Sequence, residues 1–172
     1  PFIRNVEQLT NDEIRAVLND KVKPIAIDYH NWSEEFPYAP KVEFRIAHSD
    51  DALVIMYDVE EEHVKAIAME NHGRVWEDSC VEAFIKDPVS DGFFNFENNC
   101  IGSKLAAHRL SRTDFELFTE DKLSQVRCVS SLPHQQTDIV DATGFEWGLV
   151  LMIPFSLLGL EDVPKYLNCN FY

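Results

Sequence analysis

Short runs of alternating apolar and polar residues follow one another along most of this chain, and this two-residue period constrains the fold more than any other feature. In the run 41–48, Val42, Phe44 and Ile46 alternate with charged residues, and the run 145–153 begins in a similar way. Successive side chains of a β-strand point to opposite faces, so each run predicts a strand with one face toward a core. We expect strands at residues 25–29, 41–48, 52–59, 79–86, 93–100, 103–109, 125–132, 145–153 and 167–172.

The connections between these runs predict antiparallel pairing with few helices. The segment 49–51, Ser-Asp-Asp, is a tight turn between two adjacent runs, which favours a hairpin. Thr10 and Glu13 form a capping-box pattern before a short apolar helical face, and Pro154 precedes a short apolar run that ends near Gly159. We therefore expect an all-β protein, an antiparallel β-sandwich of jelly-roll or immunoglobulin-like topology with one or two short helices.

The size and charge of the chain narrow its class. Its 172 residues have the length of a single domain with one core, and we take residues 1–172 as that domain. The 15 Lys and Arg residues against 30 Asp and Glu residues give a net charge of -15, which disfavours nucleic acid as a partner. No stretch approaches the roughly 20 consecutive apolar residues of a membrane-spanning helix. We expect a soluble protein without a membrane span; its location stays unknown, and it is secreted or periplasmic if a leader was removed.

The four cysteines predict neither a zinc cluster nor a redox motif, because none of them shows CxxC spacing. They lie within apolar strand-like runs, so buried free thiols are the expected state. An even number of thiols would also allow pairing in an oxidising compartment, although a domain of this size does not need disulfides to fold. The four residues are Cys80, Cys100, Cys128 and Cys169.

A carboxylate stands among apolar residues in the run 79–86, and it is the best functional clue in the chain. Alternation places Glu82 on one face with Cys80 and Phe84, while the opposite face is apolar as well. An ionised carboxylate in such surroundings is costly unless hydrogen bonds or a cation satisfy it, so Glu82 is a candidate ligand contact. The alternative is a buried ion pair with one of the cations on adjoining segments. These cations are Arg74, Lys104 and Arg109.

The next run, 93–100, is unusually rich in amides. Asn95 and Glu97 share one face by the two-residue period, whereas Asn98 points to the other face with two phenylalanines. Only one of these sets can line a given pocket, and we expect Asn95 and Glu97 to line it. The alternative for the whole group is backbone capping and loop anchoring at a strand end.

At this hairpin the sequence resembles the family 9 carbohydrate-binding modules, within the DOMON-like group of β-sandwiches. The likeness extends from about Lys41 to Tyr172, and its motifs are the run Trp76–Phe84, the run Phe94–Asn98, Gly102 and the run Ile153–Gly159. The resemblance implies an antiparallel sandwich that grips a sugar, typically the end of a β-linked glucan or xylan chain, between aromatic rings and polar groups. A pyranose has an apolar C–H face and a rim of hydroxyls, which suit an indole ring and carboxylate or amide groups.

The resemblance implies ligand contacts at Trp76, which matches one aromatic wall, and at Glu82, which matches a polar contact. With Asn95 and Glu97, these residues form the predicted binding site; the alternative for Trp76 is a core or rim aromatic. Asn95 and Glu97 stand where better-known members place an arginine and an asparagine, so the identity of the sugar does not carry over. The family continues beyond the position of Tyr172 through a strand that supplies the second aromatic wall, so the resemblance implies a domain that lacks its last strand.

The implied function is that of a non-catalytic module, linked to polysaccharide breakdown and delivering a glycoside hydrolase partner to its substrate. Several members of the family bind calcium, which makes calcium the candidate cofactor. Asp87 and Asp91 offer oxygen ligands in the hairpin loop, but this loop lacks the dense Asp, Asn and Gly pattern of a dedicated calcium loop. We assign no metal ligands.

Two other functions remain alternatives. Related DOMON-like sandwiches bind haem through a Met and a His, and Met69 and His72 precede the hairpin. A ligand pair this close on one segment does not easily clamp opposite faces of a haem. The second alternative is a glycoside hydrolase with Glu82 and Glu97 as acid and base, because such enzymes hold two carboxylates about 5 to 9.5 Å apart.

Overall fold

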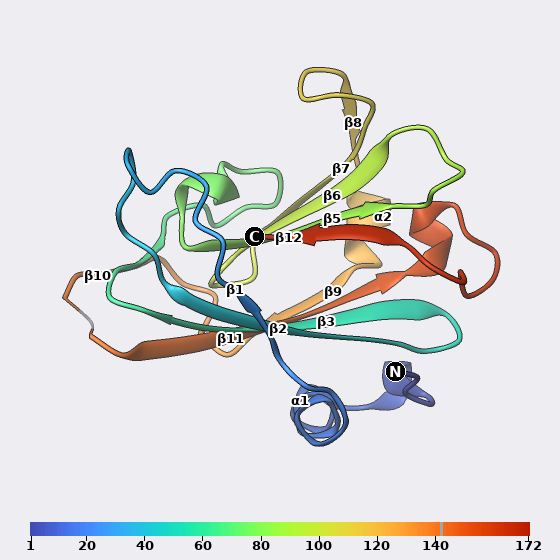
Figure 1. Ribbon diagram of the computed structural model, residues 1–172, viewed down its shortest axis with the longest axis horizontal. Helices are drawn as coiled ribbons and strands as arrows, with labels where there is room; N and C mark the ends of the chain where they lie inside the picture. Colours follow the sequence, from blue (N-terminus) through green and yellow to red (C-terminus); the bar gives the residue numbers. More distant parts are fainter. Residues whose placement is uncertain (142) are drawn as a thin grey trace.

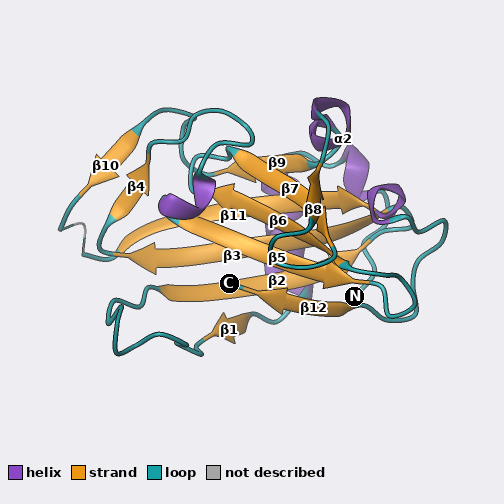
Figure 2. Cartoon of the chain, turned by 90° about the horizontal axis from the view of Figure 1, so that it is seen from above, coloured by secondary structure: helices purple, strands orange, loops and turns teal. Residues whose placement is uncertain are grey.

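The computed structural model describes residues 1–141 and 143–172 and consists mainly of two five-stranded sheets that lie face to face (Figure 1). The first sheet contains, in spatial order, β1 (Ile25–Ile27), β2 (Lys41–His48), β3 (Ala52–Glu61), β11 (Phe145–Pro154) and β9 (Arg127–Ser130). The second contains β12 (Asn168–Phe171), β5 (Cys80–Lys86), β6 (Phe93–Asn99), β7 (Lys104–Arg109) and β8 (Phe115–Leu117). Figure 2 shows the second sheet lying over the first.

The ladders between these strands are antiparallel, as is the small pair β4 (Val64–Ala66) and β10 (Thr137–Ile139) beside the sandwich. The predicted all-β antiparallel sandwich with short helices is therefore confirmed. Of the predicted strands, 41–48 has the predicted bounds, while the first strand ends at Ile27. Three strands lie outside the predicted set, β4, β8 and β10, because a three-residue strand is too short to show a period.

The core fills the space between the sheets, and the alternation in the sequence decides which side chains reach it. In β5, Val81, Ala83 and Ile85 are buried in this core, whereas Glu82 and Phe84 lie on the outer face of the second sheet. Two such inward-facing sets interdigitate across the sandwich as in other packed sheets. The largest fully buried side chains include Tyr57, Phe96, Ile55, Leu149, Leu151 and Ile153.

Helix α1 (Asn11–Lys21) covers the outer face of the first sheet, where Figure 1 shows it below β2 and β3. It begins with the predicted capping box: the Thr10 hydroxyl accepts from the Glu13 backbone N–H at 3.3 Å, and the Glu13 carboxylate accepts from the Thr10 N–H at 2.8 Å. Ile14 and Leu18 are fully buried in a second cluster between this helix and the sheet. The remaining helical segments are α2 (Glu120–Ser124) and three 3-10 turns, Val6–Gln8, Val75–Glu77 and Phe155–Leu158.

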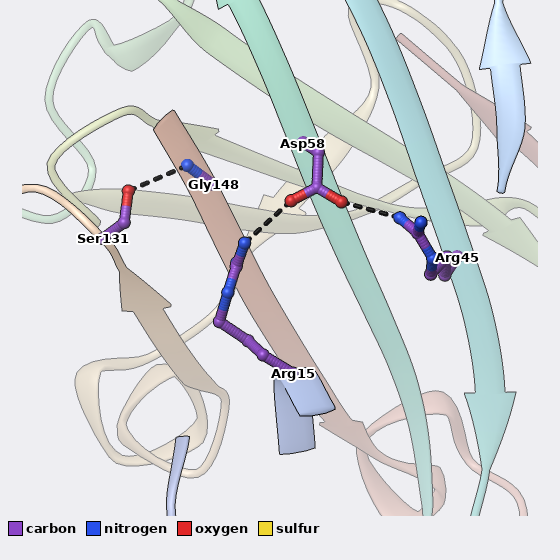
Figure 3. A network of polar contacts seen from close by, with 5 residues as sticks. All are labelled: Arg15, Arg45, Asp58, Ser131 and Gly148. Carbon is purple, nitrogen blue, oxygen red and sulfur yellow. Dashed lines mark hydrogen bonds and ion pairs between the residues drawn. The ribbon is translucent and has the colours of Figure 1, made fainter. Parts of the chain in front are cut away.

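A network of polar contacts ties α1 to the first sheet (Figure 3). The two carboxylate oxygens of Asp58 accept from Arg15 of the helix at 2.8 Å and from Arg45 of β2 at 2.7 Å. Gly148 of β11 leaves room for the Arg15 guanidinium, because a Cβ there would come within 2.6 Å of its Nη1 atom. The Gly148 N–H also donates to the Ser131 hydroxyl at 2.9 Å. Helix α1 is therefore held to this face by paired charges as well as by apolar packing.

One prediction about the cysteines needs correction. All four are free, but Cys100 alone is buried: Cys80 and Cys128 are partly exposed, and the side chain of Cys169 is exposed. It lies on β12, the edge strand of the second sheet, where the outermost strand is not covered on its open side.

Candidate functional site

A groove of about 710 Å³ lies on the outer face of the second sheet and brings together all four predicted ligand contacts. Strands β5, β6 and β7 supply its floor, while the 3-10 turn Val75–Glu77 and two loops supply its sides. The lining residues are Trp32, Trp76, Glu82, Phe84, Phe93, Asn95, Glu97, Arg109 and Arg112.

The hairpin register places two carboxylates side by side on the floor of the groove. Glu82 of β5 is the direct ladder partner of Glu97 of β6, and Phe84 is the partner of Asn95. Directly opposed residues hold their Cβ atoms about 4.5–5.5 Å apart. The Glu82 strand is fixed on both sides, since its backbone exchanges hydrogen bonds with Tyr172 at 2.8 and 3.0 Å.

Burial shifts the titration of both carboxyls. It raises the pKa of Glu82 to about 7, helped by the neighbouring charge of Glu97 and opposed by Arg109. Burial also raises the pKa of Glu97, and the charge of Arg109 and the neighbouring Asn95 oppose that rise. The two groups therefore form a coupled acid pair that gains a proton more readily than exposed carboxyls do.

A single guanidinium organises the polar side of the floor. Arg109 Nε donates to Asn95 Oδ1 at 3.1 Å, and its Nη2 lies 3.6 Å from Glu97 Oε1. The same guanidinium lies 4.5 Å from the ring centroid of Phe115 on β8, which fixes its plane. Arg109 thus orients the Asn95 amide and one oxygen of Glu97.

Two buried polar atoms on this floor are left without partners. Asn95 is 1% exposed and Glu97 is 7% exposed, yet Asn95 Nδ2 and Glu97 Oε2 find no hydrogen-bond partner within 3.5 Å among the residues that the structure describes, although the Asn95 amide is near enough to Glu97 to lower its pKa. An unpaired buried polar group costs on the order of 1–3 kcal/mol, more when it is charged. A donor and an acceptor two residues apart on one face are therefore available to a ligand.

The ion pair considered as the alternative for Glu82 does not form with the three cations proposed for it. Arg74 pairs with Glu77 in the adjoining turn, and Lys104 donates to the backbone oxygen of Val126. Arg109 approaches Glu97 rather than Glu82. Glu82 therefore remains the half-buried carboxylate at the centre of the groove without a paired cation among these three.

Trp76 stands on the 3-10 turn Val75–Glu77 and is 48% exposed, so it is a groove wall and not a core residue. Asp78 anchors this turn, because its carboxylate accepts from the backbone N–H groups of Ile67 at 3.0 Å and Ala68 at 2.9 Å. Asn99 donates to the same carboxylate at 3.0 Å. The indole is thus presented from a segment that is held to the sheet.

Several lining residues were not predicted from the sequence. Trp32 is the most consequential, because it comes from the loop between β1 and β2 and is 60% exposed. The signal that could have found it is the density of aromatic residues between Tyr29 and Tyr38, which is unusual for a loop. Phe84 and Phe93 were not predicted as lining residues either, although the two-residue period of a strand indicates the face on which each of them lies.

The residues considered for cofactors do not form a cluster. Across residues 1–141 and 143–172, no group of three or more His, Cys, Asp or Glu side chains is arranged to hold a metal ion. The Asp87 carboxylate accepts from the Ser90 hydroxyl in its own turn at 2.8 Å. Met69 packs against the main core, while His72 lies 3.6 Å from Glu120. In the described part of the chain, no helix is long and apolar enough to span a membrane.

Comparisons with known proteins agree on one family. The family model for carbohydrate-binding family 9 matches residues 12–172. A crystal structure of a Bacteroides uniformis protein inferred to bind carbohydrate superposes with a TM-score of 0.85 at 30% identity, covering 99% of this chain and 80% of that chain. None of the curated proteins matches the chain.

Two structures of a family 9 module from Caldicellulosiruptor kristjanssonii share the fold at 13% identity and a TM-score of 0.56. One was determined with glucose and covers 99% of this chain and 75% of its own; the other was determined with cellotriose and covers 99% and 73%. With the family match over nearly the whole chain, these results lead to one conclusion: the chain belongs to carbohydrate-binding family 9.

Proposed function

We propose that the protein is a non-catalytic module that binds the end of a glucan or xylan-type saccharide in the groove on the second sheet. The observation that carries this proposal is the combination of an exposed indole, Trp76, with the unpaired Asn95 Nδ2 and Glu97 Oε2 on the same groove floor. A sugar hydroxyl is both a donor and an acceptor, so it satisfies this pair, donating to the Glu97 oxygen and accepting from the Asn95 amide.

The apolar part of the groove suits the rest of a pyranose. The Trp76 ring and the neighbouring Phe84 and Phe93 offer an apolar surface to its C–H face, while Glu82 accepts from a hydroxyl on its rim. Supporting the glucan class, the related module from Caldicellulosiruptor kristjanssonii was determined with glucose and with cellotriose. We place this binding in polysaccharide breakdown, where the module holds a glycoside hydrolase partner near its substrate.

Titration calorimetry with glucose, xylose, cello-oligosaccharides and xylo-oligosaccharides tests the proposal. We expect wild type to bind at least one of these sugars and Trp76→Ala to lose that binding. The control is Tyr166→Ala, which removes an exposed aromatic ring that does not line the groove. Absence of binding across the panel, or unchanged binding by Trp76→Ala, would contradict the proposal.

The same samples distinguish binding from hydrolysis. If the bound oligosaccharide is recovered at its original length after prolonged incubation, the module acts without catalysis. Shortened products that disappear in Glu82→Gln would instead establish a glycoside hydrolase, because the acid pair would then supply the catalytic proton.

A further inference from the structure

A second cavity, of about 400 Å³, is lined by residues of both sheets and of the loop between β1 and β2, residues 28–40. It shares no lining residue with the groove. Among the described residues no lysine or arginine lines it, so its charged lining is predominantly acidic. Its aromatic residues include Tyr29, Tyr38 and Trp147, and its acidic residues are Asp28, Glu61 and Asp78.

Glu61, the last residue of β3, is the buried carboxylate of this cavity. It is 7% exposed, and its Oε1 atom accepts from Trp147 Nε1 at 2.5 Å. In the described part of the chain no lysine or arginine lies within 4.0 Å of it. Burial raises the pKa of Glu61, while hydrogen bonds from Trp147 and Ser79 and the charge of His63 oppose that rise. An ionised carboxylate has acceptor sites on both oxygens, so Glu61 is buried with spare acceptor capacity and without a paired cation.

The neighbouring Asp78 differs, because its carboxylate is satisfied within the chain. Its two oxygens accept from the backbone N–H groups of Ile67 and Ala68 at 3.0 and 2.9 Å, and Asn99 donates to one of them at 3.0 Å. Asp78 therefore adds negative charge to the cavity without needing a further partner. In a chain of net charge -15, a cavity lined by carboxylates concentrates cations from solution.

The aromatic rings of the cavity also favour a cation. A positive charge within about 6 Å of the face of an indole or phenol ring is attracted to it, and the same rings offer apolar surface to a hydrocarbon group. Trp147 is 4% exposed and is fixed by its hydrogen bond to Glu61. The Tyr38 hydroxyl accepts from the Glu62 N–H at 2.8 Å, and its ring lies 5.6 Å from the His63 ring. Both rings are therefore held in place before a ligand enters.

We propose that this cavity binds a small organic cation, a primary ammonium ion that donates to Glu61 and whose hydrocarbon part lies against Tyr38 and Trp147. The volume of about 400 Å³ is at the lower end of ligand pockets, which span roughly 300–1,000 Å³, so the ligand is a small molecule. A metal ion fits less well, since the described residues include no group of three or more His, Cys, Asp or Glu side chains arranged to hold one. This site goes beyond the proposed function, because it does not depend on sugar binding in the groove.

Nuclear magnetic resonance tests the site directly, because Trp147 Nε1 donates to Glu61. The chain has three tryptophans, and the indole N–H resonance of Trp147 is the one that remains in both Trp32→Phe and Trp76→Phe. The probes are phenethylamine, which is protonated at neutral pH, and 2-phenylethanol, a neutral molecule of nearly the same shape. We expect phenethylamine to shift the Trp147 resonance saturably and to bind about 10-fold or more tightly than the alcohol.

Glu61→Gln separates the charge of this residue from its structural contact. The amide oxygen keeps an acceptor for Trp147 Nε1, and we expect phenethylamine to bind this variant about 10-fold or more weakly. The matched control is Glu60→Gln, which removes the same charge from the adjacent residue of β3, outside the cavity lining, and should bind as wild type.

Three results would overturn the inference: an unshifted Trp147 resonance, equal binding of the amine and the alcohol, or equal affinities of Glu61→Gln and Glu60→Gln for the amine. Glu61 would then be an internal acceptor for Trp147 and no more. The comparison of the two probes uses wild type alone, so it decides the matter even if Glu61→Gln does not fold. None of these results bears on sugar binding in the groove.

Discussion

The carboxylates on the two outer faces of this sandwich differ in how fully their oxygens are paired. On the first sheet, Asp58 lies between Arg15 and Arg45, with each oxygen paired, and Arg15 reaches it from α1 (Figure 3). On the second sheet, Glu82 and Glu97 lie side by side with a single guanidinium close to Glu97, and one Glu97 oxygen has no partner among the described residues. In the first arrangement both carboxylate oxygens are paired within the chain, and the atom left without a partner among the described residues is Arg45 Nε; in the second, a carboxylate oxygen is left to a ligand.

The pairing of the carboxylate oxygens distinguishes a structural charge network from a binding site better than the burial of the residues does. Both faces contain part-buried carboxylates and arginines, so neither composition nor exposure alone distinguishes them. What differs is the number of partners available to the carboxylate oxygens, because an unpaired buried acceptor is expensive and a ligand donor recovers that cost. Changes on the second face should therefore alter binding, and changes on the first should alter stability.

The largest expected effect is that of Glu97→Ala on affinity. This change removes the acceptor with the unpaired oxygen, and loss of a charge-assisted hydrogen bond to a ligand is expected to weaken sugar binding by about 10- to 100-fold. Calorimetry measures the loss, and Glu146→Ala, which removes an exposed carboxylate of β11, is the control. Equal affinity of Glu97→Ala and wild type would remove Glu97 from the site.

The raised pKa of Glu82 also predicts a pH dependence of stability. The folded pKa of Glu82 is about 7, above its ordinary value of 4.5, so the folded state holds this proton more tightly than the unfolded state does. Its contribution is most favourable below about pH 4.5 and is lost as the pH rises to about 7, an effect on the order of 2 kcal/mol.

Urea denaturation at pH 5 and pH 8 measures this dependence. Wild type should lose stability between these values relative to Glu82→Gln, which carries no titrating group at this position. Identical pH profiles for the two proteins would mean that Glu82 titrates as an exposed carboxyl and that the groove floor is better solvated than its burial indicates.

The groove floor could be predicted from the sequence because it lies on a hairpin. The strand period alone assigns Glu82 to one face and places Asn95 and Glu97 together, and the antiparallel register brings these residues into one groove. Trp76 was found through its resemblance to a family motif. The partners of Glu82 could not be predicted, because only the structure shows that Arg109 approaches Glu97 instead.

The place of Trp32 in the groove could not be predicted for a different reason, although the density of aromatic residues in its loop marks the segment. Its loop precedes the hairpin by many residues, and its position depends on the contact between Tyr38 and the turn after β3, which no local pattern encodes. The Asp58 network also depends on long-range placement, since Arg15 and Asp58 come together only when α1 packs on the sheet. Contacts that join elements distant in sequence could therefore not be predicted from the sequence.

On the first face, Asp58→Ala is expected to cost stability and not affinity. The change leaves Arg15 and Arg45 without their shared carboxylate, and we expect a loss of about 1 kcal/mol in the free energy of unfolding, because the pairs are only part-buried. Thermal denaturation measures the loss, while sugar affinity measured at a temperature where the variant is folded should match wild type. A change in affinity would show that the two faces are coupled through the sandwich.

The smallest expected effect is that of Gly148→Ala on stability. Gly148 leaves room for the Arg15 guanidinium. In Gly148→Ala the new Cβ would lie 2.6 Å from Arg15 Nη1, so this flexible side chain must move and its ion pair with Asp58 weakens. We expect a loss below about 1 kcal/mol, and in an Arg15→Ala background the same substitution should cost less because the clash is absent. A double-mutant cycle measured by urea denaturation gives this coupling. If the cost of Gly148→Ala is the same in both backgrounds, the glycine serves the backbone of β11 and not the arginine.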